Sequence, residues 1–455
     1  MDIETDLVVI GGGMAGLVAG SVAAEAGLDV VLLRKGHGAT AQSSGAIDII
    51  GYVPGATAYL MNPVEGLHAL SAMCPFHPYS ALGRSQEGVP SDPGRVVSRV
   101  HSSVQWLKDK SSGSCGAVKG DLEENIQAVS LLGTSKPTCL IQETMWNDTP
   151  PSNDSVILFA GLRGLPDFNP SSAVKAFMAN RPYGEEGPRK AVSCILDVSS
   201  SGKPFNLSQI EIAQFVDHDA GLSALANSIE GQVLKTGADY VAVPPILGVE
   251  HARENRRQLE EMTGATVFEL TAFPPSVPGL RLQTSLEAVF RKADGRLLAG
   301  HEATEVRQAG DLVQVIAARA PRRTIEIRST AVVLASGKFL AGGLVGDERG
   351  VRESLMGLPI VDSDLIPTGD SRPQRLTGVI PLSPEGHPLF GVGLAFDSSF
   401  HPVAADGSPI AQNLFAAGSV LAGYNYAVEK SGLGVALATG FAAGANAAAY
   451  VKGVQ

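Results

Sequence analysis

The sequence has few cysteines and little positive charge, and both shortages exclude classes of function. Its 455 residues include four cysteines, Cys74, Cys115, Cys139 and Cys194, which lie far apart and form no C-x-x-C pair. Iron–sulfur clusters and zinc sites need closely spaced ligands, so this spacing argues against either centre. Free thiols indicate a reducing compartment. Lys and Arg number 35 against 46 Asp and Glu, without a long basic run, which argues against nucleic acid as a partner.

The chain also lacks the pattern of a secretory signal. Acids at Asp2, Glu4 and Asp6 stand where a signal peptide needs a basic region. Gly432 to Val451 has no charged residue and reaches the length of a membrane span. Ala and Gly dominate that segment, so its insertion energy would be weak. We therefore expect a cytoplasmic protein without a transmembrane span of its own.

The first sixteen residues carry the most informative pattern, a strand that enters a glycine-rich turn. Leu7 to Ile10 is apolar, and Gly11, Gly13 and Gly16 then fit G-x-G-x-x-G ahead of an Ala-rich helix. The first glycine permits a tight turn, the second lets a phosphate approach the backbone, and the third lets helix and strand pack closely. Free amides at the helix start favour the phosphate. The predicted phosphate ligands are Gly11, Gly13, Met14, Ala15 and Gly16.

The acid that usually follows such a loop is missing. About 20 residues on, at the end of the second strand, these folds place Asp or Glu on an adenosine ribose. Here the strand from Asp29 to Leu33 is followed by Arg34 and Lys35. Two basic side chains would suit a phosphate, as in NADP sites or a flavin mononucleotide site. The equally weighted alternative is that both side chains are solvated and that no residue takes the place of the ribose-binding acid. This departure from the usual pattern argues against FAD more strongly than against flavins in general.

The chain divides into three parts by sequence pattern. Residues 1–110 hold the first βαβ unit, and residues 111–275 form an inserted mixed α/β domain without an internal repeat. Residues 276–455 begin with a helix and continue with four short strands between Arg296 and Arg328, which we expect to be antiparallel. The first and third parts together would form the ligand-binding domain.

Further glycine turns lie near the predicted ligand. The loop with Ser43, Ser44 and Gly45 offers hydroxyls and amides to a ring or a phosphate, although the same residues are typical of a flexible turn. A buried strand enters a turn at Gly337, and another enters a turn at Gly418. The last of these precedes a helix whose amides would face the same crevice.

These pieces together resemble the two-dinucleotide-domain flavoproteins. The late Ala-Thr-Gly turn of that family is matched by Ala335-Ser336-Gly337, and its Leu-Phe-Ala-Ala-Gly strand by Leu414 to Gly418. The family usually carries an acid after that glycine, where this chain has Ser419, a weaker partner for a ribityl hydroxyl. The resemblance implies an α/β, Rossmann-like FAD/NAD(P)-binding fold with a β-meander and an inserted mixed α/β domain. It places Gly418, Ser419, Gly432 and Leu433 at the ribityl chain or the pyrimidine edge.

More specifically, the chain resembles the B subunits of anaerobic glycerol-3-phosphate dehydrogenases. The resemblance implies a flavin subunit, assigned FMN with FAD as the alternative. A catalytic A-type subunit would oxidise glycerol 3-phosphate to dihydroxyacetone phosphate with it. An iron–sulfur C-type subunit would pass electrons to membrane quinone, so the chain would lie peripherally at the inner face of the cell membrane. The matching segments are Ile10–Gly16, Arg34–Gly36, Ser43–Asp48, Leu132–Thr138, Gly161–Phe168, Pro244–Gly248, Pro274–Leu282 and Asn413–Gly423.

No catalytic base stands out in the sequence. The nine histidines are scattered, and each is more typical of a structural position. Lys338 follows a glycine turn and would stabilise reduced anionic flavin, but we favour a solvated lysine. Arg163 and Arg281 would bind a phosphate or carboxylate, but we favour surface pairing. Two other functions stay open: a non-catalytic electron-transfer or scaffold subunit, and an independent fumarate-reductase-like oxidoreductase.

Overall fold

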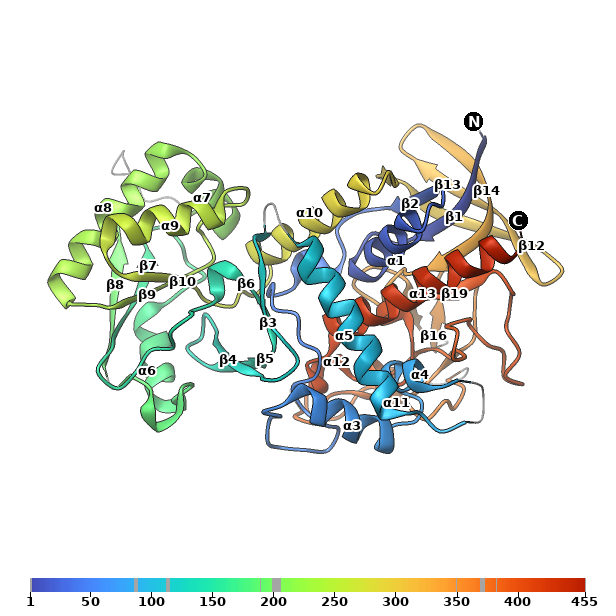
Figure 1. Ribbon diagram of the computed structural model, residues 1–455, viewed down its shortest axis with the longest axis horizontal. Helices are drawn as coiled ribbons and strands as arrows, with labels where there is room; N and C mark the ends of the chain where they lie inside the picture. The colour runs from blue at the N-terminus through green and yellow to red at the C-terminus, as the bar shows by residue number, and fades with distance from the viewer. Residues whose placement is uncertain are drawn as a thin grey trace.

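The strand predicted at the N-terminus lies inside a parallel sheet that organises the larger of two lobes (Figure 1). The computed structural model describes residues 2–85, 89–111, 115–188, 190–198, 206–348, 350–368, 373–381 and 383–454. Leu7, Val8 and Val9 have no exposed surface, as expected for a strand covered on both faces. The parallel strands are, in spatial order, β11 (Arg296–Ala299), β2 (Val30–Arg34), β1 (Asp2–Ile10), β14 (Arg323–Leu334) and β19 (Leu414–Ala416).

The expectation of four antiparallel strands between Arg296 and Arg328 is wrong for the first of them. Arg296 pairs with Val31 and Ala299 with Arg34, so β11 runs parallel to β2. The reason is the preceding helix α10 (Val277–Lys292), which carries the chain back across the sheet as a crossover connection. The meander itself consists of β12 (Glu302–Ala309), β13 (Leu312–Ala320) and β14, which pair antiparallel.

Helices α1 (Met14–Glu25) and α13 (Gly432–Val454) pack side by side over this sheet. A Cβ on Gly440 would lie 2.5 Å from the Ala15 carbonyl oxygen, and one on Gly444 would lie 2.4 Å from that of Ala19. The small residues of α13 therefore allow the two backbones to approach closely. By length and composition α13 is apolar enough to cross a membrane, and 61% of its most apolar window is buried in the lobe.

The remaining elements of the larger lobe surround this sheet. The predicted helix from Pro93 to Lys110 is confirmed, and its amino end is capped by Asp92, which accepts from the Gly94 and Arg95 amides. The other elements are α2 (Ala39–Gln42), α3 (Pro63–Met73), α4 (Pro78–Gly83), α5 (Pro93–Lys110), α11 (Pro373–Leu376), α12 (Tyr426–Glu429), β3 (Val118–Gly120), β6 (Leu140–Gln142), β15 (Leu344–Asp347), β16 (Gly350–Glu353), β17 (Ile360–Val361) and β18 (Gly393–Leu394).

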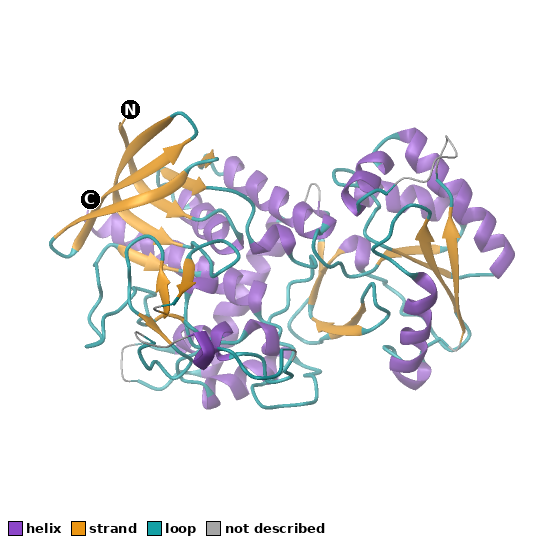
Figure 2. Ribbon diagram, turned by 180° about the vertical axis from the view of Figure 1, so that it is seen from behind, coloured by secondary structure: helices purple, strands orange, loops and turns teal. Residues whose placement is uncertain are grey.

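The smaller lobe has a sheet and a hydrophobic core of its own (Figure 2). Its four parallel strands run in the order β10 (Thr266–Glu269), β9 (Tyr240–Val243), β7 (Val156–Leu162) and β8 (Lys190–Leu196). Its core residues fall between Val129 and Leu270, inside the range predicted for the inserted domain. Helices α6 (Pro170–Asn180), α7 (Gln209–Val216), α8 (Asp219–Thr236) and α9 (Ala252–Thr263) cover this sheet.

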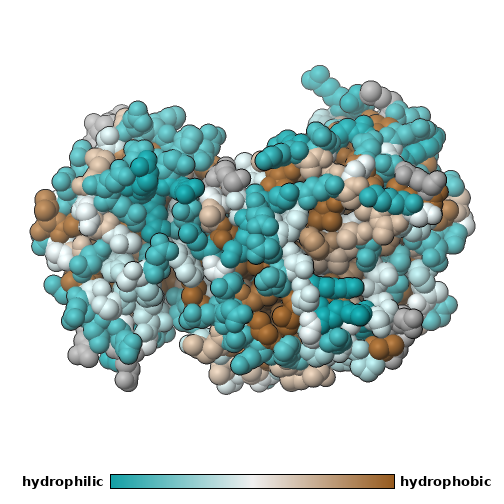
Figure 3. All heavy atoms as spheres, in the orientation of Figure 1, coloured by the Kyte–Doolittle hydropathy of each residue, from teal (hydrophilic) through white to brown (hydrophobic). Residues whose placement is uncertain are grey.

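Some residues that follow the predicted boundary at residue 111 pack against the larger lobe. Val118, Leu122, Cys139 and Leu140 lie in the predicted insert but pack in the core of the larger lobe. The hairpin of β4 (Ile126–Val129) and β5 (Ser135–Thr138) lies between Leu122 and Cys139 in the chain, close to the waist between the lobes that the space-filling view shows (Figure 3). The insert is therefore tied to the larger lobe by its first residues.

Candidate functional site

The glycine turns predicted from the sequence meet at the carboxyl edge of the larger sheet. A Cβ on Gly11 would lie 2.1 Å from the Ala335 carbonyl oxygen, at the end of β14. A Cβ on Gly418 would lie 2.6 Å from the Ala15 Cβ, in the first turn of α1. Strands β1, β14 and β19 thus end around one point. In open α/β sheets this edge is where ligands bind.

The glycines at the start of helix α1 differ in how closely the fold packs against them. A Cβ on Gly16 would lie 1.9 Å from the Gly11 carbonyl oxygen, so the packing of the fold alone requires this glycine. A Cβ on Gly13 would approach only the Thr40 hydroxyl, at 3.3 Å. That hydroxyl accepts a hydrogen bond of 2.8 Å from the Met14 amide. A Cβ at Gly13 would thus meet one side chain slightly inside ordinary contact distance, and a small shift of Thr40 would accommodate it. That Gly13 faces a ligand stays a prediction.

Arg34 and Lys35 both have carboxylate partners. Arg34 forms an ion pair with Glu287 of α10, and its side chain is 14% exposed. Lys35 lies 2.7 Å from Glu302 and is 70% exposed. Phosphate binding by these two residues stays a prediction, and the pairs argue against it. A solvated position fits Lys35 but not Arg34.

A glutamine of α10 links this ion pair to the glycine loop. The Gln283 side-chain amide donates to Glu287 at 2.8 Å and to the Gly12 carbonyl at 2.7 Å. Its oxygen is buried and has no hydrogen-bond partner among the described residues. The hydroxyl of Ser336, beside the Gly337 turn, is also buried without such a partner. Two unpaired polar atoms beside glycine turns fit a site that takes a polar ligand.

The loop with Ser43, Ser44 and Gly45 is held in place by its neighbours. Ser43 donates to the Thr40 carbonyl at 2.8 Å. Ser44 accepts a hydrogen bond of 3.2 Å from Lys136. A Cβ on Gly45 would lie 2.3 Å from Pro278 of α10. These contacts fix the loop against two other parts of the chain.

The first residues of α13 contact the end of the same loop. The Gly434 amide donates to the Asp48 carbonyl at 3.1 Å. Gly432 and Leu433 begin this helix and are partly exposed. The structure therefore brings together the predicted turns from the beginning and the end of the chain. What each residue contacts in a cofactor stays a prediction.

Lys338 is buried, so our preference for a solvated lysine is wrong. Its residue is 5% exposed, and its ammonium donates to the Phe390 carbonyl. The ammonium also lies 5.0 Å from the centre of the Tyr424 ring and 5.9 Å from that of Tyr426. Burial lowers the pKa of Lys338 to about 7, although Glu429 opposes the change. A buried lysine whose charge changes near pH 7 thus lies directly after the Gly337 turn.

A buried histidine and glutamate lie in the same region. His77 Nε2 lies 3.1 Å from Glu429 Oε2, and both side chains are almost completely buried. Burial would raise the pKa of Glu429, but His77 and hydrogen bonds from Ser431 and the Asn425 amide hold it below its usual value. The Tyr424 hydroxyl is buried without a hydrogen-bond partner among the described residues. Sequence reasoning missed this pair, because the partners are 352 residues apart.

The two arginines noted in the sequence differ in environment. Arg163 pairs with Asp197 at 2.9 Å on the surface, as expected. Arg281 does not, because both it and its partner Glu269 are completely buried, 2.6 Å apart. Thr144 donates to the same glutamate at 2.6 Å. This pair is internal and joins α10 to β10 of the smaller lobe. Within the described residues, no group of three or more His, Cys, Asp and Glu is placed to hold a metal ion.

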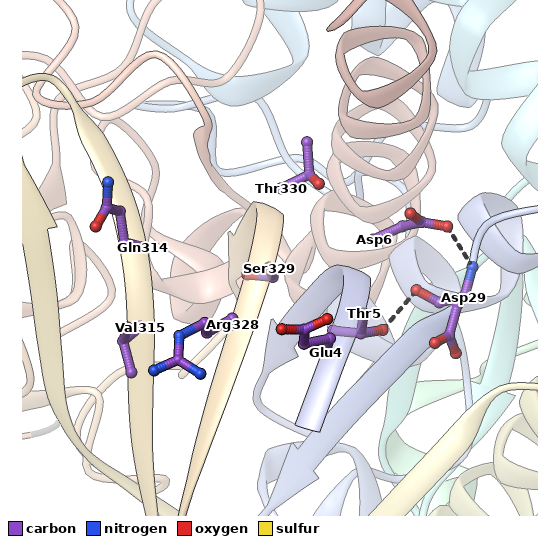
Figure 4. Close-up of a pocket in the computed structure, with 9 residues that line it drawn as sticks. All are labelled: Glu4, Thr5, Asp6, Asp29, Gln314, Val315, Arg328, Ser329 and Thr330. Carbon is purple, nitrogen blue, oxygen red and sulfur yellow. Dashed lines mark hydrogen bonds between the residues drawn. The ribbon is translucent and has the colours of Figure 1, made fainter. Parts of the chain in front are cut away.

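An open surface groove of about 570 Å³ lies at the other end of β1 (Figure 4). Glu4, Thr5 and Asp6 line it on β1, and Arg328 lines it on β14. Thr5 donates to the Asp29 carbonyl at 2.7 Å. These residues lie at the amino end of the strand, away from the glycine loop that follows Ile10. The groove therefore is not part of the candidate site.

Comparisons with known proteins agree with a flavoprotein fold. Residues 6–435 match the family model described as FAD binding domain. The B subunit of the anaerobic glycerol-3-phosphate dehydrogenase of Vibrio cholerae is 28% identical, over 96% of this chain and 94% of the relative. The B subunit of the same name from Vibrio vulnificus is 29% identical, over 97% and 95%. A relative from Halobacterium salinarum, described as a probable B subunit of this enzyme, is 28% identical, over 98% and 99%.

Solved structures with a similar course of the chain have low sequence identity. The 3-ketosteroid Δ1-dehydrogenase of Sterolibacterium denitrificans gives a TM-score of 0.42 at 12% identity, covering 98% of this chain and 99% of that one. The quinol fumarate reductase of E. coli gives 0.40 at 11% identity, covering 100% and 72%.

Proposed function

The chain belongs to the FAD binding domain family, and from this premise we propose that it is the flavin-carrying B-type subunit of an anaerobic glycerol-3-phosphate dehydrogenase. It would take part in oxidising sn-glycerol 3-phosphate to dihydroxyacetone phosphate. The observation that carries the proposal is the end-to-end match, over 96% of the chain or more, to relatives with this name. The glycine turns that meet at one sheet edge support it, because a flavin phosphate would bind there.

FMN is the form of flavin that the site supports best, although the family's description names FAD. The loop from Gly11 to Gly16 and the start of α1 would hold a phosphate. An adenosine ribose would need a free carboxylate near the end of β2. The carboxylate of Glu287 stands there, but it is paired with Arg34 and bonded to Gln283. A mononucleotide needs no such partner.

Two lysines near the loop with Ser43, Ser44 and Gly45 bring positive charge that would suit an anionic substrate. Lys136 lies 2.5 Å from Asp48 and also contacts Ser44. Burial lowers the pKa of the nearby Lys430, and the charge of Lys136 lowers it further. Asp48 opposes this change, and the Lys430 ammonium donates to the Ala427 carbonyl at 2.6 Å. An anion bound beside the two lysines would favour their charged forms. We infer that Lys136 and Lys430 would hold the phosphate of glycerol 3-phosphate.

The electron path continues outside this chain in our proposal. A bound flavin would supply the hydride-accepting chemistry. In its protonated form, the buried Lys338 would stabilise negative charge that develops beside it. The wide spacing of the four cysteines argues against a cluster in this chain, so we place the iron–sulfur relay on a C-type partner. That partner would pass electrons to membrane quinone, and the chain would lie at the inner face of the cell membrane through its partners.

One observation favours a second candidate, a scaffold or electron-transfer subunit that binds flavin weakly. The Met14 amide, at the start of α1, already donates to the Thr40 hydroxyl. The side chain of Arg34 lies over Gly12, where a Cβ would meet it at 2.7 Å. Side chains of the protein itself thus occupy part of the space above the loop. A flavin phosphate would have to compete with these contacts.

The test is the cofactor content of the purified full-length chain, produced alone and with its A-type and C-type partners. We expect flavin absorbance bands, release of FMN on denaturation, and bleaching of the bands by glycerol 3-phosphate in the assembled complex. Release of FAD would overturn the FMN assignment. A colourless chain that cannot be reconstituted would favour the scaffold role. Fumarate reduction by the chain alone would contradict the dehydrogenase assignment.

Gly13→Val tests the phosphate site itself. A Cβ at Gly13 would meet only the Thr40 hydroxyl, at 3.3 Å, and a small shift of that side chain accommodates it, so the variant should fold but lose flavin. Gly231→Val is the matched control, because a Cβ at this position of α8 would meet nothing within 4 Å. Flavin per protein is measured by absorbance, and folding by circular dichroism. A folded Gly13→Val protein with a full complement of flavin would refute the assignment.

A further inference from the structure

We propose that a cavity of about 460 Å³ at the junction of the lobes binds an uncharged aromatic molecule with a carboxamide-like edge. The cavity is separate from the flavin site but adjacent to it. Ala46, which follows Gly45, packs against the lining residues Ala128, Ile141 and Met145. One layer of side chains therefore separates the cavity from the loop with Ser43, Ser44 and Gly45. Its walls come from residues 59–61, 124–129, 141–150, 182–184 and 268–271.

Three buried polar atoms on the wall have no hydrogen-bond partner among the described residues. They are the side-chain oxygens of Asn125 and Asn147 and the side-chain nitrogen of Gln127. Asn125 is 3% exposed, and its nitrogen donates to the Ile50 and Leu60 carbonyls at 2.9 and 3.0 Å. Its free oxygen is therefore fixed as an acceptor. Unpaired buried polar atoms cost stability, so their presence points to a ligand that pairs with them.

These atoms define the edge of the ligand. The Asn125 oxygen needs a donor, and the Gln127 nitrogen needs an acceptor. A carboxamide or lactam edge offers both groups side by side. The side-chain amide of Asn147 can pair with the donor or with the acceptor of this edge, because its oxygen is buried without a hydrogen-bond partner in the described part of the chain.

The charge of the lining excludes an anion. Among the described lining residues there is no Lys, Arg or His. Glu124 and Asp148 stand exposed on the wall, and Glu269 is already paired with Arg281. A phosphate or carboxylate would meet negative charge without a compensating cation. The cavity is therefore unsuited to glycerol 3-phosphate, and this inference does not rest on the proposed function.

The remaining walls favour a flat ring. Tyr59, Trp146, Tyr183 and Phe268 contribute aromatic surface. Ring stacking and edge contacts stabilise aromatic ligands in such surroundings. Small-molecule pockets have volumes of about 300–1,000 Å³, apolar walls and a few placed polar groups. The cavity has a volume in this range, and its walls combine these aromatic side chains with a few polar groups.

The chain offers a direct probe, because it has two tryptophans and one of them lines the cavity. Trp106 lies in the larger lobe, 6.3 Å from the Phe441 ring centre, so Trp106→Phe leaves Trp146 as the reporter. The ligands are benzamide, benzoate and benzamidine, which have similar size and differ in charge. Benzamide should change the emission of Trp146 saturably, with a dissociation constant on the order of 1 mM. Benzoate and benzamidine should bind at least about tenfold more weakly.

Gln127→Leu, in the same Trp106→Phe background, tests the polar wall. Losing one hydrogen bond should weaken benzamide about tenfold. Gln314→Leu is the control, because Gln314 is exposed in the groove on β13 and should leave binding unchanged. Thermal melts check that both variants fold. No saturable binding of benzamide, equal or tighter binding of a charged analogue, or unchanged affinity in Gln127→Leu would overturn the proposal.

Discussion

Replacing the buried Lys338 by methionine should make the stability of the protein less dependent on pH. The ammonium donates to the Phe390 carbonyl and lies over the Tyr424 ring, in a region closed to solvent. Burial lowers the pKa of Lys338 from 10.5 to about 7. Between these two values the unfolded chain binds a proton that the folded chain does not bind. The lysine therefore costs stability increasingly as the pH falls from 10.5 towards 7.

The size of this effect follows from the two pKa values. Between pH 9.5 and pH 7.0 the folded protein should lose about 3 kcal/mol through Lys338, at about 1.36 kcal/mol for each unit of pKa difference. Below pH 7 the folded protein binds the proton as well, and the loss levels off. For a chain of 455 residues, a melting entropy of about 2.1 cal/mol/K per residue converts 3 kcal/mol into about 3 °C of Tm.

The assay is the Tm of the natural protein and two variants at pH 7.0 and pH 9.5. The Tm of the natural protein should rise between these pH values by about 3 °C more than that of Lys338→Met. Lys175→Met is the control, because Lys175 is exposed on α6, and this variant should follow the natural protein. Parallel pH dependence of Lys338→Met and the natural protein would refute the burial argument.

Three further substitutions test the packing around the site. Gly16→Ala should prevent folding, because its Cβ would lie 1.9 Å from a backbone oxygen; soluble, folded protein would contradict this geometry. Arg281→Met should lower the free energy of unfolding by about 3–5 kcal/mol, since it leaves the buried Glu269 unpaired; a loss below about 1 kcal/mol in urea titrations would sink this account. Arg34→Leu should leave Glu287 with only Gln283 and the more distant Arg291, and raise the affinity for FAD relative to FMN by about tenfold in reconstitution; unchanged selectivity would contradict it.

The sequence predicts the elements whose pattern is local. The apolar run before Gly11 and the three glycines suffice for β1, the turn and α1. The helix from Pro93 to Lys110 is equally clear, because Asp92 and Pro93 mark its start. The direction of β11 is not local. It depends on pairing with β2, a segment more than 260 residues earlier in the chain. From local pattern alone, this short strand next to the meander is predicted to belong to the meander.

The turns of the candidate site could be predicted, but the partners of its charged residues could not. Glu287, which pairs with Arg34, is 253 residues away in the sequence. In the sequence, Lys338 has the pattern of a surface lysine that follows a glycine turn. Nothing nearby in the sequence shows that Tyr424 and Phe390 cover it. Tertiary packing decides which charges are buried and paired, and a single sequence does not contain that information in local form.

The pair of Arg34 and Glu287 changes the meaning of the missing ribose acid. The sequence shows an arginine where flavoproteins of this type carry an acid. The structure places an acid beside that arginine, but from helix α10. An adenosine ribose could use this carboxylate only if Arg34, which is 14% exposed, lost its partner. Leaving a partly buried charge unpaired is costly. In our proposal the site would therefore keep its phosphate loop and disfavour the adenosine half of FAD, as expected of an FMN site; the FAD-to-FMN selectivity of Arg34→Leu tests this.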